Sequence, residues 1–353
     1  MASLVSLYKA ILVERSQMFG KFRQQKHLSD FAVDDYHPFF FLFRIIHSLY
    51  QLPRPLPTKS RAIFILGSSG TGKSKLAIGL ALRFRGEVIN SDKMQVYAGL
   101  EVITNKVTPK ECAGVPHLLL GELHPEADFT ATEFRRRATI LSDDITSRGR
   151  LPIIAGGSNS FIRELVEGDG AAFRLRYDCC FICVDVEQPD LDDFVGERVD
   201  QMVEQGLVDE ARDLFDPAAD YTKGIRRSIG VPEMDKYLRR EARAREEERA
   251  ALLAEALDEI KENTKRLTRV QRQKIRRFEA DDSWPLFRVD ATEAVRRRRD
   301  EAAERVWLRT VEAPAIELVN WFVGGVRLVN RCGGAVAACG EEVAIIAAMG
   351  TTN

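Results

Sequence analysis

Between residues 61 and 310, short apolar runs alternate with segments whose apolar residues recur every three to four positions. The runs predict buried strands at 61–66, 87–92, 151–157, 179–186 and 287–292. The periodic segments predict helices after Lys73 and over 129–148, 190–215 (broken near Gly206), 238–279 and 293–309. Strands and helices that alternate along a chain are typical of a parallel sheet covered on both faces. We therefore predict an α/β fold in which the long, charged helical stretch forms a helical subdomain.

The two ends of the chain depart from this alternation. Residues 1–60 are rich in aromatic side chains and end in the proline-rich stretch Leu52–Pro57, and basic residues outnumber acidic ones before residue 30. We interpret this segment as a leader and linker with some features of a transit peptide, although its serine content is low. Residues 311–353 are rich in alanine, glycine and valine, and we expect an atypical, loosely packed tail. Neither end contains an apolar run that predicts a membrane span.

The composition excludes some classes of function. The net charge is -1 over 353 residues, so no global basic field would attract nucleic acid or a membrane surface. The six cysteines are scattered and do not suggest a disulfide framework. Cys180 and Cys183 have zinc-ligand spacing, but they fall in a predicted strand with no second ligand pair, so we interpret them as core residues.

A phosphate-binding loop follows the first predicted strand. The residues Gly67–Ser74 fit the pattern G-x-x-x-x-G-K-[ST], with a strand before them and a helix after them. In this motif the backbone N–H groups point into one cavity, the lysine adds charge beside the outer phosphates, and the hydroxyl of the last residue binds Mg2+. The sequence therefore predicts a diphosphate on a helix N-terminus.

A carboxylate is expected beside this loop. Asp92 ends the second predicted strand, and ligands of such folds bind at the carboxyl ends of parallel strands. From the residues alone, an aspartate that caps a turn is the favoured interpretation.

From residue 61 to residue 310 the chain resembles the isopentenyltransferase family, which includes tRNA dimethylallyltransferases and plant adenylate isopentenyltransferases. The resemblance depends on an ordered set of segments, which are 67–74, 89–97, 104–107, 114–117, 128–131, 156–160, 197–203, 206–210, 224–227, 230–233, 260–264, 273–275 and 289–292. The segments 92–97 and 156–160 look most like the plant branch. The chain departs from that branch at Leu118, where a second histidine usually follows His117, and at Ser69, where threonine is usual.

The resemblance implies transfer of a dimethylallyl group from dimethylallyl diphosphate to the exocyclic N6 amine of an adenine nucleotide, the first step of cytokinin biosynthesis. Asp92 would be the general base, while Lys73 and Arg226 would stabilise the departing diphosphate, with Mg2+ on Ser74 as the cofactor. The expected substrate-binding residues are Gly67, Ser68, Ser69, Gly70, Thr71, Gly72, Lys73, Ser74, Lys106, Ser158, Asn159 and Ser160. For Ser158 and Asn159, helix capping is an equally good interpretation.

Two other functions remain open at this stage. The first is the same transfer to tRNA, which the arginines of 266–277 would allow; however, no histidine follows Val311, so that end of the chain cannot form a zinc finger of paired cysteines and histidines. The second is a P-loop kinase or NTPase, in which Asp185 would bind Mg2+. We expect a monomer that makes no membrane contact, located in a plastid, with the mitochondrion or cytoplasm as alternatives.

Overall fold

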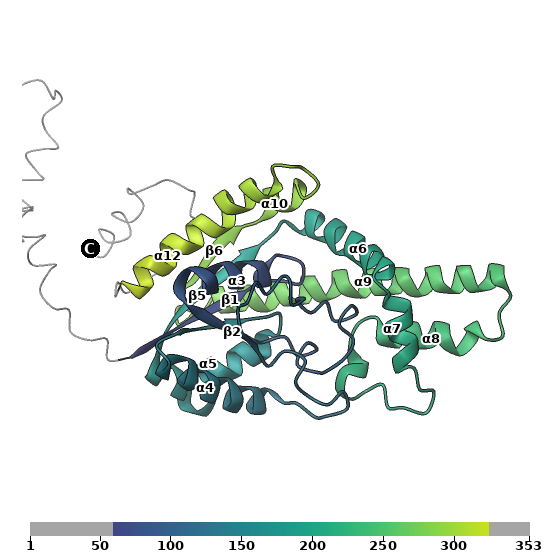
Figure 1. Ribbon diagram of the computed structural model, residues 1–353, viewed down its shortest axis with the longest axis horizontal. Helices are drawn as coiled ribbons and strands as arrows, with labels where there is room; N and C mark the ends of the chain where they lie inside the picture. Colours follow the sequence, from purple (N-terminus) through teal and green to yellow (C-terminus); the bar gives the residue numbers. More distant parts are fainter. Residues whose placement is uncertain (1–58, 325–353) are drawn as a thin grey trace, which may run out of the picture. The chain divides into compact units, whose positions relative to one another are not determined.

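The computed structural model describes residues 59–324, which form a parallel sheet flanked by helices (Figure 1). Within this range the sheet has six strands in the order β3-β2-β4-β1-β5-β6, and every pairing is parallel. The strands are β1 (Ser60–Leu66), β2 (Gly86–Asn90), β3 (His117–Leu118), β4 (Leu151–Ala155), β5 (Tyr177–Asp185) and β6 (Leu286–Asp290). The α/β fold class predicted from the sequence is confirmed.

The register of the central strands brings three loops to one edge of the sheet. Ala155 of β4 lies opposite both Ile65 of β1 and Asn90 of β2. Because the strands are parallel, the segments that follow them, which begin at Gly67, Ser91 and Gly156, all leave from the same edge. This edge is where ligands bind in open α/β sheets.

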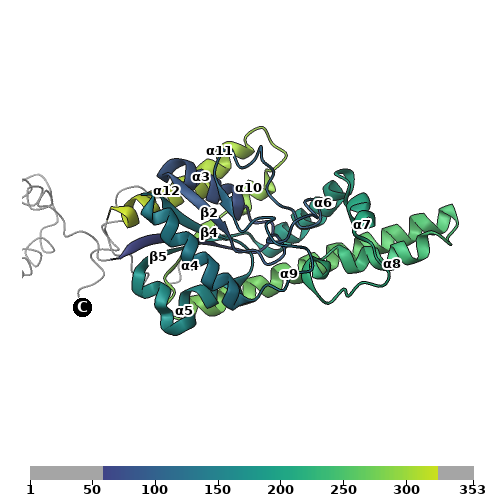
Figure 2. The ribbon, with the colours of Figure 1, turned by 60° about the horizontal axis from the view of Figure 1, so that its bottom comes forward.

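Helices cover both faces of the sheet, as expected for a parallel sheet. One face packs against α3 (Lys73–Phe84) and α12 (Ala313–Val323), and the other packs against α4 (Ala131–Ser147) and α5 (Asn159–Arg176) (Figures 1 and 2). Helix α4 begins at a capping residue, because the hydroxyl of Thr130 accepts a hydrogen bond from the N–H of Glu133 at 3.1 Å. The sequence had not predicted α5 or β3.

The predicted helical subdomain is present beyond the carboxyl edge of the sheet. It contains α6 (Gln188–Glu204), α7 (Leu207–Leu214), the 3-10 turn η2 (Gly224–Arg227), α8 (Val231–Glu241) and α9 (Glu246–Glu279). The predicted break near Gly206 is confirmed, because this residue separates α6 from α7 with a φ of 102°. A turn also separates α8 from α9, where we predicted one continuous helix. Figure 2 shows α9 running from this subdomain back beneath the sheet.

The end of the described chain differs from the prediction. In place of one helix over 293–309 there are α10 (Thr292–Arg296), α11 (Ala303–Trp307), the π-helical turn η3 (Leu308–Glu312) and α12. Val311, Ala315 and Val319 are fully buried against α3 and the sheet. Loose packing from residue 311 therefore does not describe 311–323, whose apolar residues recur at helical spacing. The leader 1–58 and the segment 325–353 lie outside the described residues.

Two smaller expectations also concern the described part of the chain. Cys180 and Cys183 are buried in the core, and burial raises the pKa of both thiols. Among residues 59–324, no helix is both long enough and apolar enough to cross a membrane.

Candidate functional site

The loop that follows β1 depends on glycines for its shape. Gly70 and Gly72 have φ values of 88° and 92°, a region that favours glycine. Space is also limited, because a Cβ at Gly72 would lie 2.5 Å from the indole ring of Trp307. The hydroxyl of Thr71 donates to the carbonyl of Ser68 at 3.0 Å, which closes the turn from within. The loop is therefore held by its own residues and by the helix that carries Trp307.

The N-terminus of α3 presents unpaired donors. The backbone N–H groups of Gly72, Lys73 and Ser74 have no hydrogen-bond partner among residues 59–324. The Nζ of Lys73 donates to the carbonyl of Ser68 at 2.6 Å. Burial lowers the pKa of Lys73 to about 8, and the nearby charge of Asp92 acts in the opposite direction. Several donors and one ammonium group thus gather where an anion would bind.

Asp92 lies at the carboxyl end of β2, as predicted. Its Oδ1 accepts the N–H of Met94 at 2.9 Å, which leaves Oδ2 on the side of Gly157. A Cβ at Gly156 would lie 2.4 Å from the carbonyl carbon of Ser91 and 2.5 Å from the nitrogen of Asp92. The glycines after β4 therefore allow close packing against the backbone that carries the Asp92 carboxylate.

The polar residues after this glycine pair mainly bond to backbone. Ser158 Oγ accepts the N–H of Lys93 at 2.8 Å, so it braces the Asp92 loop and does not cap α5. The amide of Asn159 is buried and donates to the carbonyl of Gln271 at 3.2 Å, while its Oδ1 has no partner. Ser160 is exposed on the first turn of α5. Of the three, Asn159 is the one with a buried polar atom that lacks a partner.

Lys106, an expected substrate-binding residue, lies within the loop that follows β2. Its side chain is only 2% exposed, and Nζ donates to the carbonyl of Gly99 and lies 3.3 Å from a carboxylate oxygen of Glu101. These contacts hold the loop between β2 and β3 together. They do not support the prediction that Lys106 faces the phosphates of a nucleotide.

The contacts of Arg226 also do not support its expected role in stabilising the departing diphosphate. Arg226 is buried, donates to the carbonyl of Leu214 at 2.8 Å and stacks over Tyr221 in the helical subdomain. The neighbouring Arg227 is exposed, and its charge lowers the pKa of Tyr97 against the larger effect of burial, which raises it. The charge of Arg227 also adds to the effect of burial in lowering the pKa of Lys93. Of these two adjacent arginines, Arg227 is therefore the one near the Asp92 loop.

Helix α9 contributes residues that the sequence analysis missed. The amide of Gln271 accepts the N–H of Ser69 at 2.8 Å and donates to the carbonyl of Gly157 at 3.0 Å. The carbonyl of Thr268 accepts the hydroxyl of Ser68 at 3.0 Å. A signal was available, because Thr264, Thr268 and Gln271 continue the buried stripe of Leu252, Ala256 and Ile260 with polar residues.

Asp185 is committed to ion pairs. Its carboxylate lies 3.2 Å from Arg272 and also contacts Arg288. Two arginines therefore neutralise a carboxylate that would otherwise resemble the Mg2+-binding aspartate of a P-loop NTPase. This arrangement does not favour Asp185 as a Mg2+ ligand.

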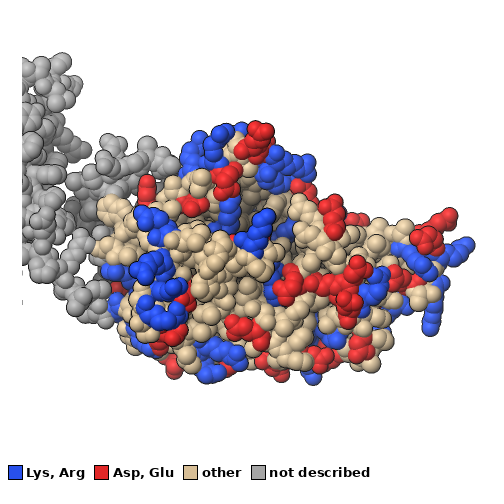
Figure 3. Space-filling model, viewed as in Figure 1, with Lys and Arg blue, Asp and Glu red and all other residues tan. Residues whose placement is uncertain are grey.

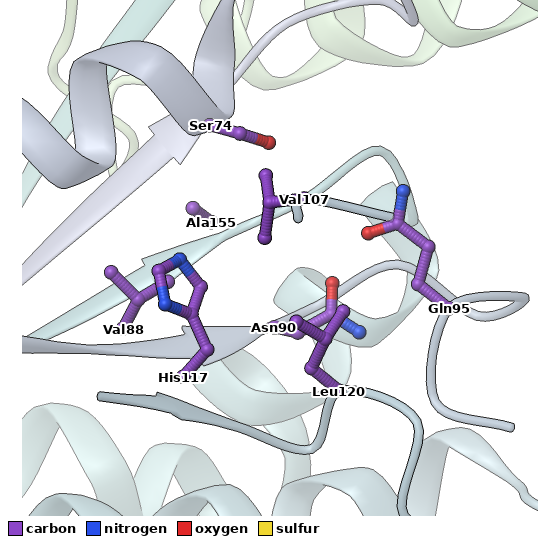
Figure 4. Close-up of a pocket in the computed structure, with 8 residues that line it drawn as sticks. All are labelled: Ser74, Val88, Asn90, Gln95, Val107, His117, Leu120 and Ala155. Atoms are coloured by element: carbon purple, nitrogen blue, oxygen red, sulfur yellow. The ribbon is translucent and has the colours of Figure 1, made fainter. Parts of the chain in front are cut away.

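A pocket opens between Ser74 and the ends of β2, β3 and β4 (Figure 4). Four of its lining residues are apolar and four are polar, namely Val88, Val107, Leu120 and Ala155, and Ser74, Asn90, Gln95 and His117. The Nδ1 of His117 lies 2.9 Å from the carbonyl of Val115, while Nε2 is buried without a partner. Burial lowers the pKa of His117, so a neutral ring that donates from Nδ1 fits this position.

The residues around Ser74 suit one kind of metal site. Among residues 59–324, no group of three or more histidine, cysteine, aspartate or glutamate side chains could hold a metal ion by itself. Ser74 offers a hydroxyl beside the unpaired N–H groups of α3. Mg2+ usually keeps several waters and binds through few protein ligands together with substrate phosphates. The donor set therefore fits Mg2+ that arrives with a diphosphate.

Solved structures share this architecture. A eukaryotic dimethylallyltransferase that acts on tRNA matches 77% of the chain with a TM-score of 0.61 at 20% identity, covering 81% of that protein. The tRNA isopentenylpyrophosphate transferase of Bacillus halodurans matches 73% of the chain with a TM-score of 0.55 at 26% identity, covering 99% of that protein. At such identities the first likeness shows the fold alone.

Sequence comparisons identify the family more directly than these structural likenesses do. Adenylate isopentenyltransferase 5 (chloroplastic) of Arabidopsis thaliana is 53% identical over 268 residues, which is 75% of this chain and 81% of the relative. Adenylate isopentenyltransferase 7 (mitochondrial) of the same plant is 47% identical, over 76% of this chain and 82% of the relative. The adenylate isopentenyltransferase of Humulus lupulus is 39% identical, over 73% of this chain and 89% of the relative. The family model "IPP transferase" matches residues 95–175 and 169–278. The chain therefore belongs to the IPP transferase family, the family of the adenylate isopentenyltransferases, and is a prenyl-transferring enzyme.

Proposed function

We propose that this protein transfers the dimethylallyl group of dimethylallyl diphosphate to N6 of a free adenine nucleotide, the first step of cytokinin formation. The observation that carries the proposal is the position of Asp92 relative to the phosphate-binding loop. Burial lowers the pKa of Lys73, and the Asp92 carboxylate is close enough for its charge to oppose that shift. A base and an anion-binding loop therefore meet at one edge of the sheet, as a substitution at an allylic diphosphate requires.

Different residues of the site would act on the two reacting groups, the N6 amine and the diphosphate. The N6 lone pair attacks the allylic carbon while the carbon–oxygen bond to the diphosphate breaks, and the bonding electrons leave with the diphosphate. Asp92 accepts the proton that N6 loses. The N–H groups of α3 and the ammonium of Lys73 stabilise the charge that grows on the leaving group. Mg2+, held by Ser74 and the diphosphate, would supply further positive charge there.

The five-carbon tail is proposed to enter beside Ser74, where the pocket has a cavity volume of about 10 Å³ and its walls must therefore move apart to admit the tail. The pocket begins next to the residue that would hold Mg2+ and continues between Val88, Val107 and Leu120 (Figure 4). The apolar half of the lining would help to keep water from the carbocation-like transition state, which water would otherwise trap as an alcohol.

The acceptor is proposed to be a free nucleotide and not tRNA. The relatives at 39–53% identity are named as adenylate isopentenyltransferases, whereas the matched structures of tRNA enzymes are 20–26% identical. On the face shown in Figure 3, basic and acidic side chains are interspersed with wide uncharged areas. A polyanion such as tRNA usually requires a more continuous basic surface. A P-loop kinase is disfavoured because Asp185 is neutralised by arginines.

The compartment and the oligomeric state are further proposals. Relatives are named as chloroplastic or mitochondrial, and the basic, acid-poor start of residues 1–30 is consistent with an organelle leader. We propose a plastid location. We also propose that the enzyme acts as a monomer, because the site is built from the residues of one chain.

A product assay tests the proposed function. The protein is incubated with Mg2+ and dimethylallyl diphosphate together with AMP, ADP, ATP or an unmodified tRNA, and products are identified by mass. We expect a prenyl adduct on at least one free nucleotide and no adduct on tRNA. Adducts on tRNA alone would indicate that the enzyme acts on tRNA. Phosphate release from ATP without a prenyl donor would favour a kinase or NTPase.

A further inference from the structure

The indole ring of one tryptophan lies against the phosphate-binding loop. A Cβ at Gly72 would lie 2.5 Å from Cη2 of Trp307 and 2.7 Å from its Cζ3, so the six-membered part of the ring packs directly on the Gly72 backbone. Helix α3 begins after Gly72, and the N–H of Gly72 is one of the unpaired donors of the loop among residues 59–324. Trp307 is 5% exposed, although it comes from the far end of the described chain. The sequence analysis assigned no role to this tryptophan.

Packing holds the indole in this position. Its Nε1 is buried and has no hydrogen-bond partner among residues 59–324. Lys75 lies over the ring, with Nζ 4.8 Å from the ring centroid, and the same Nζ pairs with Glu304 at 2.5 Å. The side chains of this pair are 48% and 64% exposed, so the pairing contributes little to stability. The contact with Gly72 therefore depends on the buried ring itself.

The helical segment that carries Trp307 is anchored in the core. Helix α11 continues through the π-helical turn η3 into α12, and Val311, Ala315 and Val319 are fully buried at intervals of four residues. Trp307 stands four residues before Val311 and extends the same row. Because an α-helix has 3.6 residues per turn, such a row gradually rotates to one side, and a π-helical turn, which contains more residues, offsets the rotation. One face of this segment can therefore reach both the core and the loop.

The loop needs such support at Gly72. An anion binds well to backbone N–H groups when they already point to one place, because ordering them on binding would cost affinity. Gly72 has a φ of 92° and no Cβ, so its own side chain cannot restrict the backbone. The hydroxyl of Thr71 closes the turn from within, and the ring of Trp307 covers Gly72 from the outside.

We infer that Trp307 is a positioning residue, whose indole holds the Gly72 N–H in the orientation that binds the diphosphate. This inference rests on the proposed function, because it takes the anion to be the diphosphate of the prenyl donor. Trp307 acts through Gly72 and takes no part in making or breaking bonds. The helical segment 303–323 thereby contributes to binding at the edge of the sheet.

Calorimetric titration of the full-length protein with inorganic pyrophosphate in the presence of Mg2+ tests the inference. Trp307→Leu should weaken pyrophosphate binding about tenfold, the effect of losing one hydrogen bond to a charged group. Trp307→Phe keeps an aromatic ring and loses only a donor that has no partner, so it should bind more tightly than Trp307→Leu.

Trp284→Leu is the matched control. Trp284 is 2% exposed and packs against Phe181 and Phe278 in the core on the other face of the sheet. Both leucine variants lose a buried indole and should unfold at a lower temperature than the wild type. Only Trp307→Leu should also bind pyrophosphate more weakly in the folded state. A merely structural role of Trp307 predicts equal affinities for the two variants.

Tryptophan fluorescence gives a second measurement, which decides the question if Trp307→Leu does not fold. The chain has three tryptophans, Trp284, Trp307 and Trp321. Pyrophosphate should change the emission of the wild type and of Trp284→Phe, and this change should be absent from Trp307→Phe. A change that Trp307→Phe retains in full, or a wild-type emission that pyrophosphate does not alter, would overturn the inference.

The outcomes also distinguish this inference from the proposed function. Pyrophosphate binding within about twofold of wild type in Trp307→Leu would overturn the inference and leave the function standing. An equal loss of affinity in Trp284→Leu would do the same. Weaker binding in Trp307→Leu alone, in a protein that makes no prenyl product, would retain Trp307 as a positioning residue for an anion and overturn the function. A wild-type protein that does not bind pyrophosphate would overturn both.

Discussion

The side chain of Gln271 accepts a hydrogen bond from the backbone N–H of Ser69 at 2.8 Å. The other end of the same amide donates to the carbonyl of Gly157 at 3.0 Å, so one residue of α9 joins the phosphate-binding loop to the glycine pair beside Asp92. A primary amide suits this position because it has one acceptor and one donor at the required ends. The distance between the leaving-group site and the base therefore depends on α9.

Replacing Gln271 by leucine should loosen this connection. The N–H of Ser69 and the carbonyl of Gly157 would lose their partner in a buried place, which typically costs about 1–3 kcal/mol of stability for each group left unsatisfied. We expect kcat to fall about tenfold, because a small displacement of Asp92 from the reacting nitrogen is costly. Steady-state kinetics and chemical denaturation measure both effects. Gln273→Leu, at an exposed position of the same helix, should change neither.

Asp92→Asn removes the proposed base while keeping its size. We expect kcat for prenyl transfer to fall about 100- to 10,000-fold, the usual contribution of a positioned general base. Binding of Mg2+ and pyrophosphate should persist, because the loop amides and Lys73 are unchanged. Asp178→Asn, at an exposed position near the start of β5, is the control and should leave kcat unchanged. Normal turnover in Asp92→Asn would show that another group accepts the proton.

Local patterns were sufficient to predict much of this fold. The strand–glycine–helix pattern predicted a phosphate-binding loop at Gly67–Ser74, and the end of the second predicted strand pointed to Asp92. Both positions could be inferred because they depend on neighbours in sequence and on one rule, that parallel strands end at one edge. The segment after residue 310 was missed because its composition suggested a tail, although Val311, Ala315 and Val319 follow helical spacing.

Contacts between distant segments could not be predicted in this way. Gln271 is 202 positions from Ser69, and nothing near it in the sequence indicates a polar group that faces a loop. Arg226 and Arg227 are adjacent, and their order alone does not say which side chain turns inward; the 3-10 turn η2 directs Arg226 to Leu214 and leaves Arg227 near Tyr97. Which of these two arginines lies near the Asp92 loop therefore depends on the geometry of the backbone.

Gly156→Ala should disable the site more than it harms the fold. The added Cβ would lie 2.4 Å from the carbonyl carbon of Ser91, so the backbone that carries Asp92 must move. We expect kcat to fall at least tenfold, together with a loss of about 1–3 kcal/mol of stability, typical of overpacking. Gly196→Ala is the matched control, since nothing lies within 4 Å of its added Cβ and alanine favours helix α6. An active Gly156→Ala enzyme would mean that this loop adjusts without cost.

The ionisation of Glu87 makes the stability of the fold depend on pH in the acidic range. Its side chain is 3% exposed and contacts Arg148, which donates from Nη2 at 2.8 Å, and Arg150 at 3.1 Å. The hydrogen bonds from Arg148 hold its pKa below the ordinary value, so the ionised form stabilises the fold above the unfolded-state pKa. That stabilisation should disappear as the pH falls through the lower folded-state pKa.

Glu87→Gln should therefore lose about 1–3 kcal/mol at neutral pH, because it removes the charge of a buried carboxylate that accepts hydrogen bonds from the partly exposed Arg148. Its free energy of unfolding should also fall less steeply than that of the wild type below pH 5. Urea denaturation at a series of pH values measures both. Asp144→Asn removes a 58% exposed carboxylate that pairs with the same arginine, and should cost less than about 1 kcal/mol. Equal effects of the two substitutions would contradict the importance of burial.

Val107→Phe tests whether the pocket of Figure 4 receives the prenyl tail. A phenyl ring would occupy space between Ser74 and Leu120 without changing the charge of the phosphate-binding loop. We expect kcat/KM for dimethylallyl diphosphate to fall at least tenfold, while the affinity for inorganic pyrophosphate stays within twofold of wild type. Only a tail-binding pocket predicts this separation, because a general disturbance of the loop would weaken both ligands. Val270→Phe, on the exposed side of α9, should leave both values unchanged, and if Val107→Phe does so too, the tail binds elsewhere.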